Sequence, residues 1–132
     1  MTADELNSKL EGRLPGLLGM RFLSVTKARV TAELPLRADL LNLVEVVHGG
    51  TLMAFADMVG AAGAIVNLPE GMGTATIESK TNFLAAGRTG TLHAEAIPLH
   101  IGRQTMVWQT KVSDDKGKLL SMTIQTQIVT PR

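Results

Sequence analysis

The sequence predicts an α+β fold in which a strongly curved antiparallel sheet wraps around one long central helix. Three observations favour this fold. The segment 46–66 is almost uninterrupted apolar sequence, and Asp57 is its only charged residue. Two strand-like segments precede it and four follow it. Strands joined by short turns form antiparallel sheets, and a sheet curved around the helix would cover much of its apolar surface.

The segments before the helix are short. Residues 3–11 predict a helix, and glycine and proline then interrupt the chain, at Gly12, Pro15, Gly16 and Gly19. Segment 20–26 predicts the first strand. Segment 29–36 predicts the second, because apolar side chains alternate along it, at Val30, Ala32 and Leu34. Residues 39–42 indicate a turn or a short loop element.

The apolar segment predicts a helix that starts near Gly49-Gly50 and ends before Pro69, with Thr51 as its N-cap. Its sixteen residues 51–66 are fewer than the ~20 apolar residues that span a membrane. We therefore expect a core helix and no membrane insertion. Its small residues, among them Gly60 and Gly63, would let the sheet approach the helix backbone closely.

Four strands are predicted after the helix, at 74–84, 91–101, 105–112 and 118–128. The second of them changes phase at Pro98, which indicates a bulge or an edge. In the third, one face carries Met106, Trp108 and Val112. In the fourth, we expect one apolar face made of Leu120, Met122, Ile124 and Ile128. Residues 114–117 predict the hairpin turn between the last two strands.

Composition limits the classes of function. The 132 residues, 45% of them hydrophobic, suit one domain over 1–132. Thirteen basic against twelve acidic side chains give no field that attracts nucleic acid or an anionic membrane. There is no cysteine, which excludes disulfides, thiolate nucleophiles and cysteine-bound metal. No histidine–carboxylate set has the spacing of metal ligands, so we expect no metal.

Two features of the apolar segment carry potential chemistry. A carboxylate such as Asp57 is costly in an apolar helix unless it is bonded, paired or neutralised. It is either a functional group or a structural one that bonds a neighbouring backbone or hydroxyl group. Free N–H groups at the helix start, at Gly49 and Gly50, would suit a developing oxyanion. The alternative is a flexible helix entry in which His48 only caps or packs.

The spacing of these features predicts a dimer. Gly49 and Asp57 are eight residues apart, or ~12 Å along a helix. Both cannot touch one reacting carbonyl group from the same helix. They would do so if two copies of the helix lay antiparallel, and a two-fold homodimer contains that arrangement twice.

The pattern Asn-x5-His-Gly-Gly-x6-Asp, formed by Asn42, His48, Gly49, Gly50 and Asp57, resembles the signature of the hotdog-fold acyl-CoA thioesterases. The branch it is most similar to is the phenylacetate-degradation or 4-hydroxybenzoyl-CoA type. The segments TATIESKTNFL, AAGRTGTL, IGRQTMVW and VSDDKGKLLSMTIQT follow that family's strand pattern as well. The resemblance runs from Pro15 to Ile128 and implies a hotdog fold.

The resemblance also implies an activity and residue roles. The expected reaction is hydrolysis of an acyl-CoA to a free acid and coenzyme A, with no cofactor because coenzyme A is part of the substrate. The Gly49 N–H would polarise the thioester carbonyl, and Asp57 of the opposite subunit would act as nucleophile or base. Asn42 and His48 would hold the thioester or the water, and Gly50 would adjoin the substrate. Thr76 would assist, with Thr74 as the alternative.

Basic side chains are expected near the coenzyme A phosphates, and Arg88 and Arg103 are the candidates. Lys80 is a third, for which a solvated surface charge is the favoured interpretation. We expect at least a homodimer and, as a dimer of dimers, a homotetramer. The N-terminus lacks the basic start and apolar core of a signal peptide, so a cytoplasmic location is expected. The acyl group stays open between aryl, arylacetyl and fatty acyl chains.

Two other functions compete with hydrolysis. One is a non-catalytic acyl-CoA-binding hotdog module, against which the complete set of Asn42, His48, Gly49 and Asp57 argues. The other is a hotdog hydratase or dehydratase, which uses a histidine and an acid in other motifs.

Overall fold

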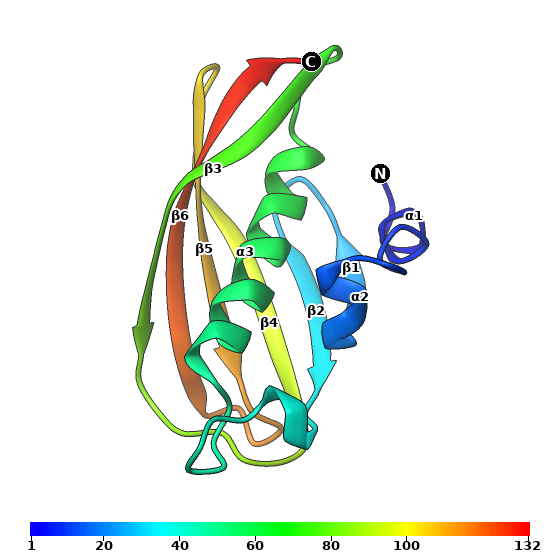
Figure 1. Ribbon diagram of the computed structural model, residues 1–132. Coiled ribbons are helices and arrows are strands. Elements are labelled where there is room, and N and C mark those ends of the chain that lie inside the picture. The colour runs from blue at the N-terminus through cyan, green and yellow to red at the C-terminus, as the bar shows by residue number, and fades with distance from the viewer.

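The computed structural model describes residues 1–132 and shows an antiparallel sheet curved around one long helix, α3 (Figure 1). The helices are α1 (Ala3–Asn7), α2 (Leu14–Leu18), the 3₁₀ turn η1 (Ala38–Leu40) and α3 (Gly49–Ile65). The strands are β1 (Arg21–Val25), β2 (Val30–Pro35), β3 (Met72–Phe83), β4 (Thr91–Ile101), β5 (Thr105–Ser113) and β6 (Leu119–Pro131). Their order in the sheet is β1-β2-β4-β5-β6-β3. The predicted α+β class is confirmed.

Helix α3 begins two residues before the predicted N-cap. His48 is the N-cap, and its Nδ1 accepts a hydrogen bond from the Gly50 N–H at 2.8 Å. The prediction that Thr51 caps the helix is wrong, because its hydroxyl donates to the Leu40 carbonyl at 3.1 Å instead. This bond ties the first turn of α3 to η1.

Small residues bring α3 close to the sheet, as predicted. A Cβ atom added at Gly63 would lie 2.5 Å from the Trp108 ring, and one at Gly60 would lie 2.3 Å from Oε1 of Gln125. Real Cβ atoms do not approach other atoms so closely, so both glycines are required by the packing. Trp108, Phe22 and Phe55 are the largest apolar side chains of the buried core around them.

Three strands follow the predicted alternation. The inward residues of β2, β4 and β5 are buried, and they include Val30, Ala32, Leu34, Leu92, Ala94, Ala96, Met106, Trp108 and Val112. The register of β4 with β5 shifts between Pro98 and His100, which confirms the predicted bulge. The hairpin turn at 114–117 is also confirmed, with the Asp114 carboxylate accepting from the N–H groups of Lys116 and Lys118.

Strand β6 presents the opposite face from the one predicted. Of the expected apolar face only Leu120 is buried, whereas Ile124 is exposed and Met122 and Ile128 are intermediate. The inward side is polar instead, and its fully buried members are Ser121, Thr123, Gln125 and Gln127. Thr123, Gln127 and the amide nitrogen of Gln125 have side-chain hydrogen-bond partners, whereas the Ser121 hydroxyl and Oε1 of Gln125 have none.

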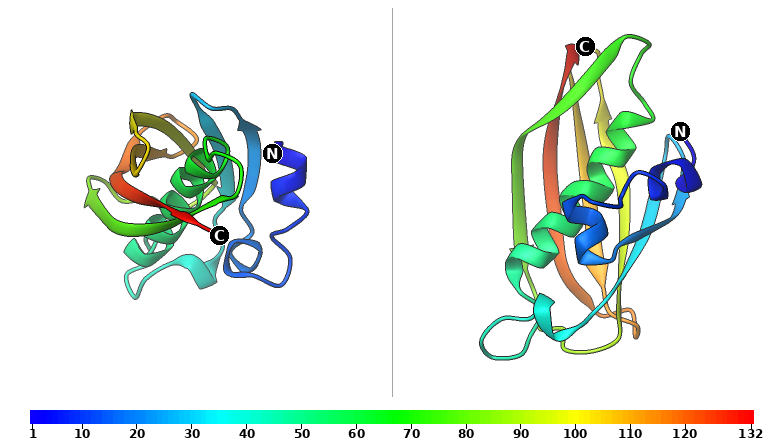
Figure 2. Two further views of the ribbon diagram at one scale, coloured as in Figure 1. Left: turned by 90° about the horizontal axis from the view of Figure 1, so that it is seen from above. Right: turned by 45° about the vertical axis from the view of Figure 1, so that its right-hand side comes forward.

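The N-terminal segment contains a helix that the sequence pattern did not predict. Pro15 and Gly16 were interpreted as breakers, yet they lie inside α2 near its start, where proline is tolerated. The predicted helix 3–11 is confirmed over α1 alone, which a capping box of Thr2 and Glu5 begins. Both helices lie on the β1–β2 side of the molecule (Figure 2).

The two edges of the sheet differ in how their backbone groups are satisfied. At β1, the Asn7 side chain bonds both the N–H and the carbonyl of Phe22, at 2.8 and 2.9 Å. At β3, no backbone group between Gly73 and Phe83 has a hydrogen-bond partner outside β6. The free edge of β3 is thus open to another strand. No helix of the structure combines the length and apolar character needed to cross a membrane.

Candidate active site on the central helix

Asp57 lies midway along α3, half-buried, on the side of the helix that faces β3 and β6. Its Oδ1 accepts a hydrogen bond from the Thr76 hydroxyl at 3.0 Å and from Nε2 of Gln125 at 3.2 Å. Its Oδ2 has no hydrogen bond within the chain. One carboxylate oxygen is held in place, and the other has no partner within the chain.

The start of α3 leaves one N–H group free. The Gly50 N–H is taken by His48 Nδ1, and the N–H groups of Thr51 and Leu52 donate to the His48 carbonyl at 2.9 and 3.2 Å. The Gly49 N–H has no acceptor. Of the two predicted glycines, only Gly49 therefore offers a donor to a substrate, in a position where the helix dipole favours negative charge.

The capping bond also determines which tautomer His48 adopts. Because Nδ1 accepts the bond from Gly50, a neutral ring carries its proton on Nε2. The side chain is exposed, so this Nε2–H is a second donor at the helix start. His48 thus organises the helix terminus and presents a donor beside it.

Phe83 is a neighbour of the helix start that the sequence pattern did not indicate. A Cβ added at Gly49 would lie 3.2 Å from two atoms of the Phe83 ring. Phe83 as a whole residue is about half exposed, at 54%. Phe83 therefore forms an apolar wall beside the free Gly49 N–H.

Asn42 lies in the loop that leads to the helix. Its Oδ1 accepts from the N–H groups of Val44 and Val46 at 3.0 and 3.2 Å. The loop includes Glu45 at a φ of 61°, a left-handed conformation that few non-glycine residues adopt. The Asn42 oxygen is thus occupied by its own loop, and its Nδ2 group is left for a ligand. Together with exposed Leu43, Asn42 and His48 line one hollow of the surface.

The predicted basic residues lie at different ends of the molecule. Nη1 of Arg88 lies 3.4 Å from the Val44 carbonyl, so Arg88 stands beside the loop of Asn42. Arg103 is in the β4–β5 turn, at the end opposite the start of α3 (Figure 1). Lys80 is exposed and donates to Oδ1 of Asn82 on the same strand at 2.8 Å, which fits a solvated surface charge. Within one chain, only Arg88 is near the helix start.

Thr76 and Thr74 have separate partners. Thr76 donates to Asp57, whereas the Thr74 hydroxyl lies 3.0 Å from both Oε1 of Gln127 and the Ile128 carbonyl. Nε2 of Gln127 in turn donates to Thr76 at 2.6 Å. The two glutamines were not predicted as site residues. The sequence does contain a sign of them, because polar residues occupy every second position of β6 from 121 to 127. The apolar residues at the positions between them were interpreted as the buried face instead.

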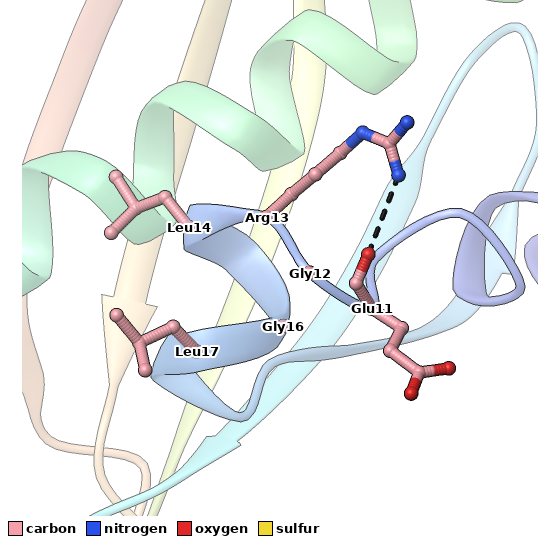
Figure 3. Close-up of a pocket in the computed structure, with 6 residues that line it drawn as sticks. All are labelled: Glu11, Gly12, Arg13, Leu14, Gly16 and Leu17. Atoms are coloured by element: carbon pink, nitrogen blue, oxygen red, sulfur yellow. Dashed lines mark hydrogen bonds between the residues drawn. The ribbon is translucent and has the colours of Figure 1, made fainter.

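The largest surface hollow is elsewhere. It is lined by a single N-terminal segment, from Glu11 to Leu17, in which Leu14 and Leu17 project from α2 and Arg13 bonds the Glu11 carbonyl (Figure 3). None of the predicted site residues lines it. Its only charged groups, Glu11 and Arg13, are exposed, so it lacks the convergent polar groups of an active site.

Comparisons with known proteins agree with the fold. A model of the thioesterase superfamily matches residues 45–121. The chain is 26% identical over 119 residues to 1,4-dihydroxy-2-naphthoyl-CoA hydrolase of Escherichia coli (strain K12), covering 90% of this chain and 88% of the relative.

Solved structures give the same result. A thioesterase of Haemophilus influenzae superposes with a TM-score of 0.94 at 25% identity, covering 99% of this chain and 92% of the other. A mutant thioesterase of Pseudomonas aeruginosa also has a TM-score of 0.94, at 27% identity, covering 98% and 94%. The predicted hotdog arrangement is confirmed.

Proposed function

The chain belongs to the thioesterase superfamily and is a thioester hydrolase, and from this premise we propose that it cleaves an acyl-CoA between the subunits of a homodimer. The observation that carries the proposal is the pair of free groups on α3. These are the Gly49 N–H, which has no acceptor, and the Asp57 Oδ2, which has no donor. One group suits the carbonyl oxygen of a thioester, and the other suits an attack on its carbon.

A second subunit is needed to bring these groups together. Gly49 and Asp57 lie on one continuous helix, ~12 Å apart at 1.5 Å per residue. A thioester carbonyl group is far shorter than this separation. In a two-fold dimer with antiparallel α3 helices, Gly49 of one subunit would face Asp57 of the other.

The open edge of β3 supports such a dimer. Its backbone groups have no partner outside β6, and the N-terminal helices lie on the other side of the molecule (Figure 2). An unprotected edge strand of twelve residues is a template for pairing with another strand. Antiparallel pairing of two β3 strands would join both sheets and set the two α3 helices side by side.

The chemistry then needs only the chain's own residues. As a base, Asp57 Oδ2 takes a proton from water, and the water oxygen attacks the thioester carbon. As a nucleophile, Oδ2 attacks the carbon itself and forms an anhydride that water then opens. In both routes the carbon–sulfur bond breaks, and the thiolate of coenzyme A leaves with the electron pair and takes up a proton. The Gly49 N–H stabilises the negative oxygen, as an oxyanion-hole donor does.

The roles proposed for the remaining residues follow from their positions. His48 Nε2–H and Asn42 Nδ2 would hold the thioester end or the water, and Arg88 would bind a phosphate of coenzyme A. Gly50 would contact the substrate without a free N–H, since His48 occupies it. Arg103, at the opposite end of the molecule from the start of α3, would reach the substrate only from a different subunit.

An acyl-CoA panel tests the proposal. Release of the free thiol is measured for aryl, arylacetyl and fatty acyl-CoAs, because the hydrolase of Escherichia coli that the chain resembles is named for an aromatic acyl group. For the best substrate, Asp57→Asn is expected to lower kcat by about 10²–10⁴-fold, the usual contribution of a general base. Full turnover by this variant, or hydration of an enoyl-CoA in place of hydrolysis, would contradict the proposal.

A further inference from the structure

We infer that Gln125 and Gln127 are positioning residues that orient the Asp57 carboxylate for the reaction, an inference that rests on the proposed function. Both side chains are fully buried under α3, on the inward face of β6. A strand interior of this kind is ordinarily apolar. The inward placement of two amides beneath a single carboxylate therefore needs a reason.

Gln125 acts on Asp57 directly. Its Nε2 donates at 3.2 Å to Oδ1 of the carboxylate and at 3.2 Å to the Asp57 carbonyl. Its Oε1 is buried and has no hydrogen-bond partner. Gly60 leaves the space for this amide, because a Cβ there would lie 2.3 Å from Oε1. An apolar side chain would fill the same space without an unpaired polar atom, so packing alone does not favour glutamine here.

Gln127 acts on Asp57 through Thr76. Its Nε2 donates to the Thr76 oxygen at 2.6 Å, and its Oε1 lies 3.0 Å from the Thr74 hydroxyl. A threonine hydroxyl has one proton. Since the Thr76 oxygen already accepts from Gln127, its own proton is directed to Asp57 Oδ1, 3.0 Å away. If the Gln127 amide were rotated so that Oε1 faced Thr76, the Thr76 hydroxyl would donate to Oε1 and not to the carboxylate.

The two paths end on the same oxygen. Oδ1 receives both donors and Oδ2 receives none. This asymmetry fixes the rotation of the carboxylate and directs Oδ2 toward the reactants. Either proposed route uses the ionised carboxylate, and a variant that removes a donor from a carboxylate disfavours that form.

A purely structural role for the glutamines predicts a different result. If they only joined α3 to the sheet, their loss would lower the stability of the fold and leave the chemistry of Asp57 unchanged. Two measurements separate these cases. One is the division of any effect between kcat and KM, and the other is the acidic limb of the pH–rate profile, which reports ionisation of the reacting acid.

The variants are Gln125→Met and Gln127→Met, which retain side-chain volume and remove the donor. Thr110→Val is the matched control, since Thr110 is a fully buried β5 residue whose hydroxyl has no partner. We expect each methionine variant to lower kcat by about 10–100-fold with KM little changed, because Gln125→Met removes a hydrogen bond to the charged carboxylate and Gln127→Met removes the donor that directs the Thr76 proton to it. The acidic limb should move to higher pH, and Thr110→Val should change neither quantity.

Thermal unfolding checks that each variant is folded. If the methionine variants do not fold, Thr76→Val on the edge strand β3 removes the hydroxyl that links Gln127 to Asp57. The pH–rate profile of this variant should show the same shift of the acidic limb. Unchanged kcat and unchanged acidic limb in the folded variants would overturn the inference. Asp57→Asn, measured alongside, separates the two proposals. An inactive Asp57→Asn with unaffected glutamine variants refutes only the positioning role, and an active Asp57→Asn refutes the proposed function.

Discussion

Gly49 combines two properties that substitutions can separate. Its N–H has no acceptor, and a Cβ at this position would lie 3.2 Å from the Phe83 ring. His48 before it has a φ of −64° and a ψ of 137°, a conformation that is compatible with a following proline. Proline is tolerated at the first position of a helix, where its missing N–H has no intrahelical partner.

Gly49→Pro and Gly49→Ala therefore form a matched pair. Both introduce a Cβ next to Phe83, and only proline removes the N–H. We expect Gly49→Pro to lower kcat by about 10²–10³-fold, as loss of one oxyanion-hole donor does, while Gly49→Ala retains most of the activity. Steady-state kinetics with the best acyl-CoA measures both, and circular dichroism verifies α3. Equal activity of the two variants would show that this N–H does not polarise the carbonyl.

The residues of the site were predictable to different degrees. An isolated carboxylate in an apolar helix marked Asp57, and a histidine before two glycines marked the helix start. The partners of Asp57 were less accessible, because they depend on how β3 and β6 are aligned beneath the helix. Thr76 was anticipated from a family resemblance. Gln125 and Gln127 were not, since the alternation of polar residues along β6 does not by itself show which side of the strand faces the carboxylate.

Among the elements, the hairpin turn of β5 and β6 is joined to the start of β4 by Asp115. Its carboxylate lies 2.7 Å from His93 Nε2 and accepts from the Thr91 N–H at 3.0 Å. These hydrogen bonds, that of His93 first, hold the pKa of Asp115 below its ordinary value of 3.8. Lowered pKa values of this kind link stability to pH.

The direction of that linkage is predictable. With a lowered pKa in the folded state, the Asp115 contribution is fully present above the ordinary pKa and is lost as pH falls through the folded-state pKa. The urea midpoints of the native protein and Asp115→Ala should thus differ above about pH 4, and this difference should shrink as pH falls further. Lys116→Ala, in the same turn, is the control. A difference that persists unchanged in acid would rule out the Asp115 interaction as its source.

Elements with simple alternation were predicted best. In β2, in β4 as far as Ala96, and in β5 apart from Thr110, every second residue is apolar and buried, so the pattern and the core agree. In β6 the apolar residues Met122, Ile124 and Ile128 lie on the outer face, where Ile124 is 38% exposed, and the polar residues Thr123, Gln125 and Gln127 are buried on the inner face. Helix α2 was missed because Pro15 was interpreted only as a breaker, although proline also favours the first turn of a helix. In both errors a residue type was given only one interpretation: apolar strand residues were taken to be buried, and proline was taken to end a helix.

At the scale of the whole molecule, the proposed dimer places each site between two chains. In each site one subunit supplies Asp57 and the other supplies Gly49, so Asp57→Asn and Gly49→Pro remove groups that come from different subunits. A heterodimer of the two variants contains one site with both changes and one site with neither.

Mixing the two inactive variants should therefore restore activity. After joint refolding at equal concentration, half of the dimers are heterodimers with one intact site, so about one quarter of native activity is expected. Each variant refolded alone is the control. No recovery, in a mixture shown by mass spectrometry to contain heterodimers, would place both groups of a site within one chain.

The close approach of α3 to the sheet has a consequence for folding. Glycine at positions 60 and 63, which the contacts with Gln125 and Trp108 require, costs about 1 kcal/mol at each position in an isolated helix. A free peptide of residues 49–65 should accordingly be a random coil in water, since short helices are marginal even with good formers. The helix is acquired only as strands from both ends of the chain close around it. Nascent or partly unfolded chains consequently lack a competent carboxylate, and regain of hydrolysis reports completion of the native state.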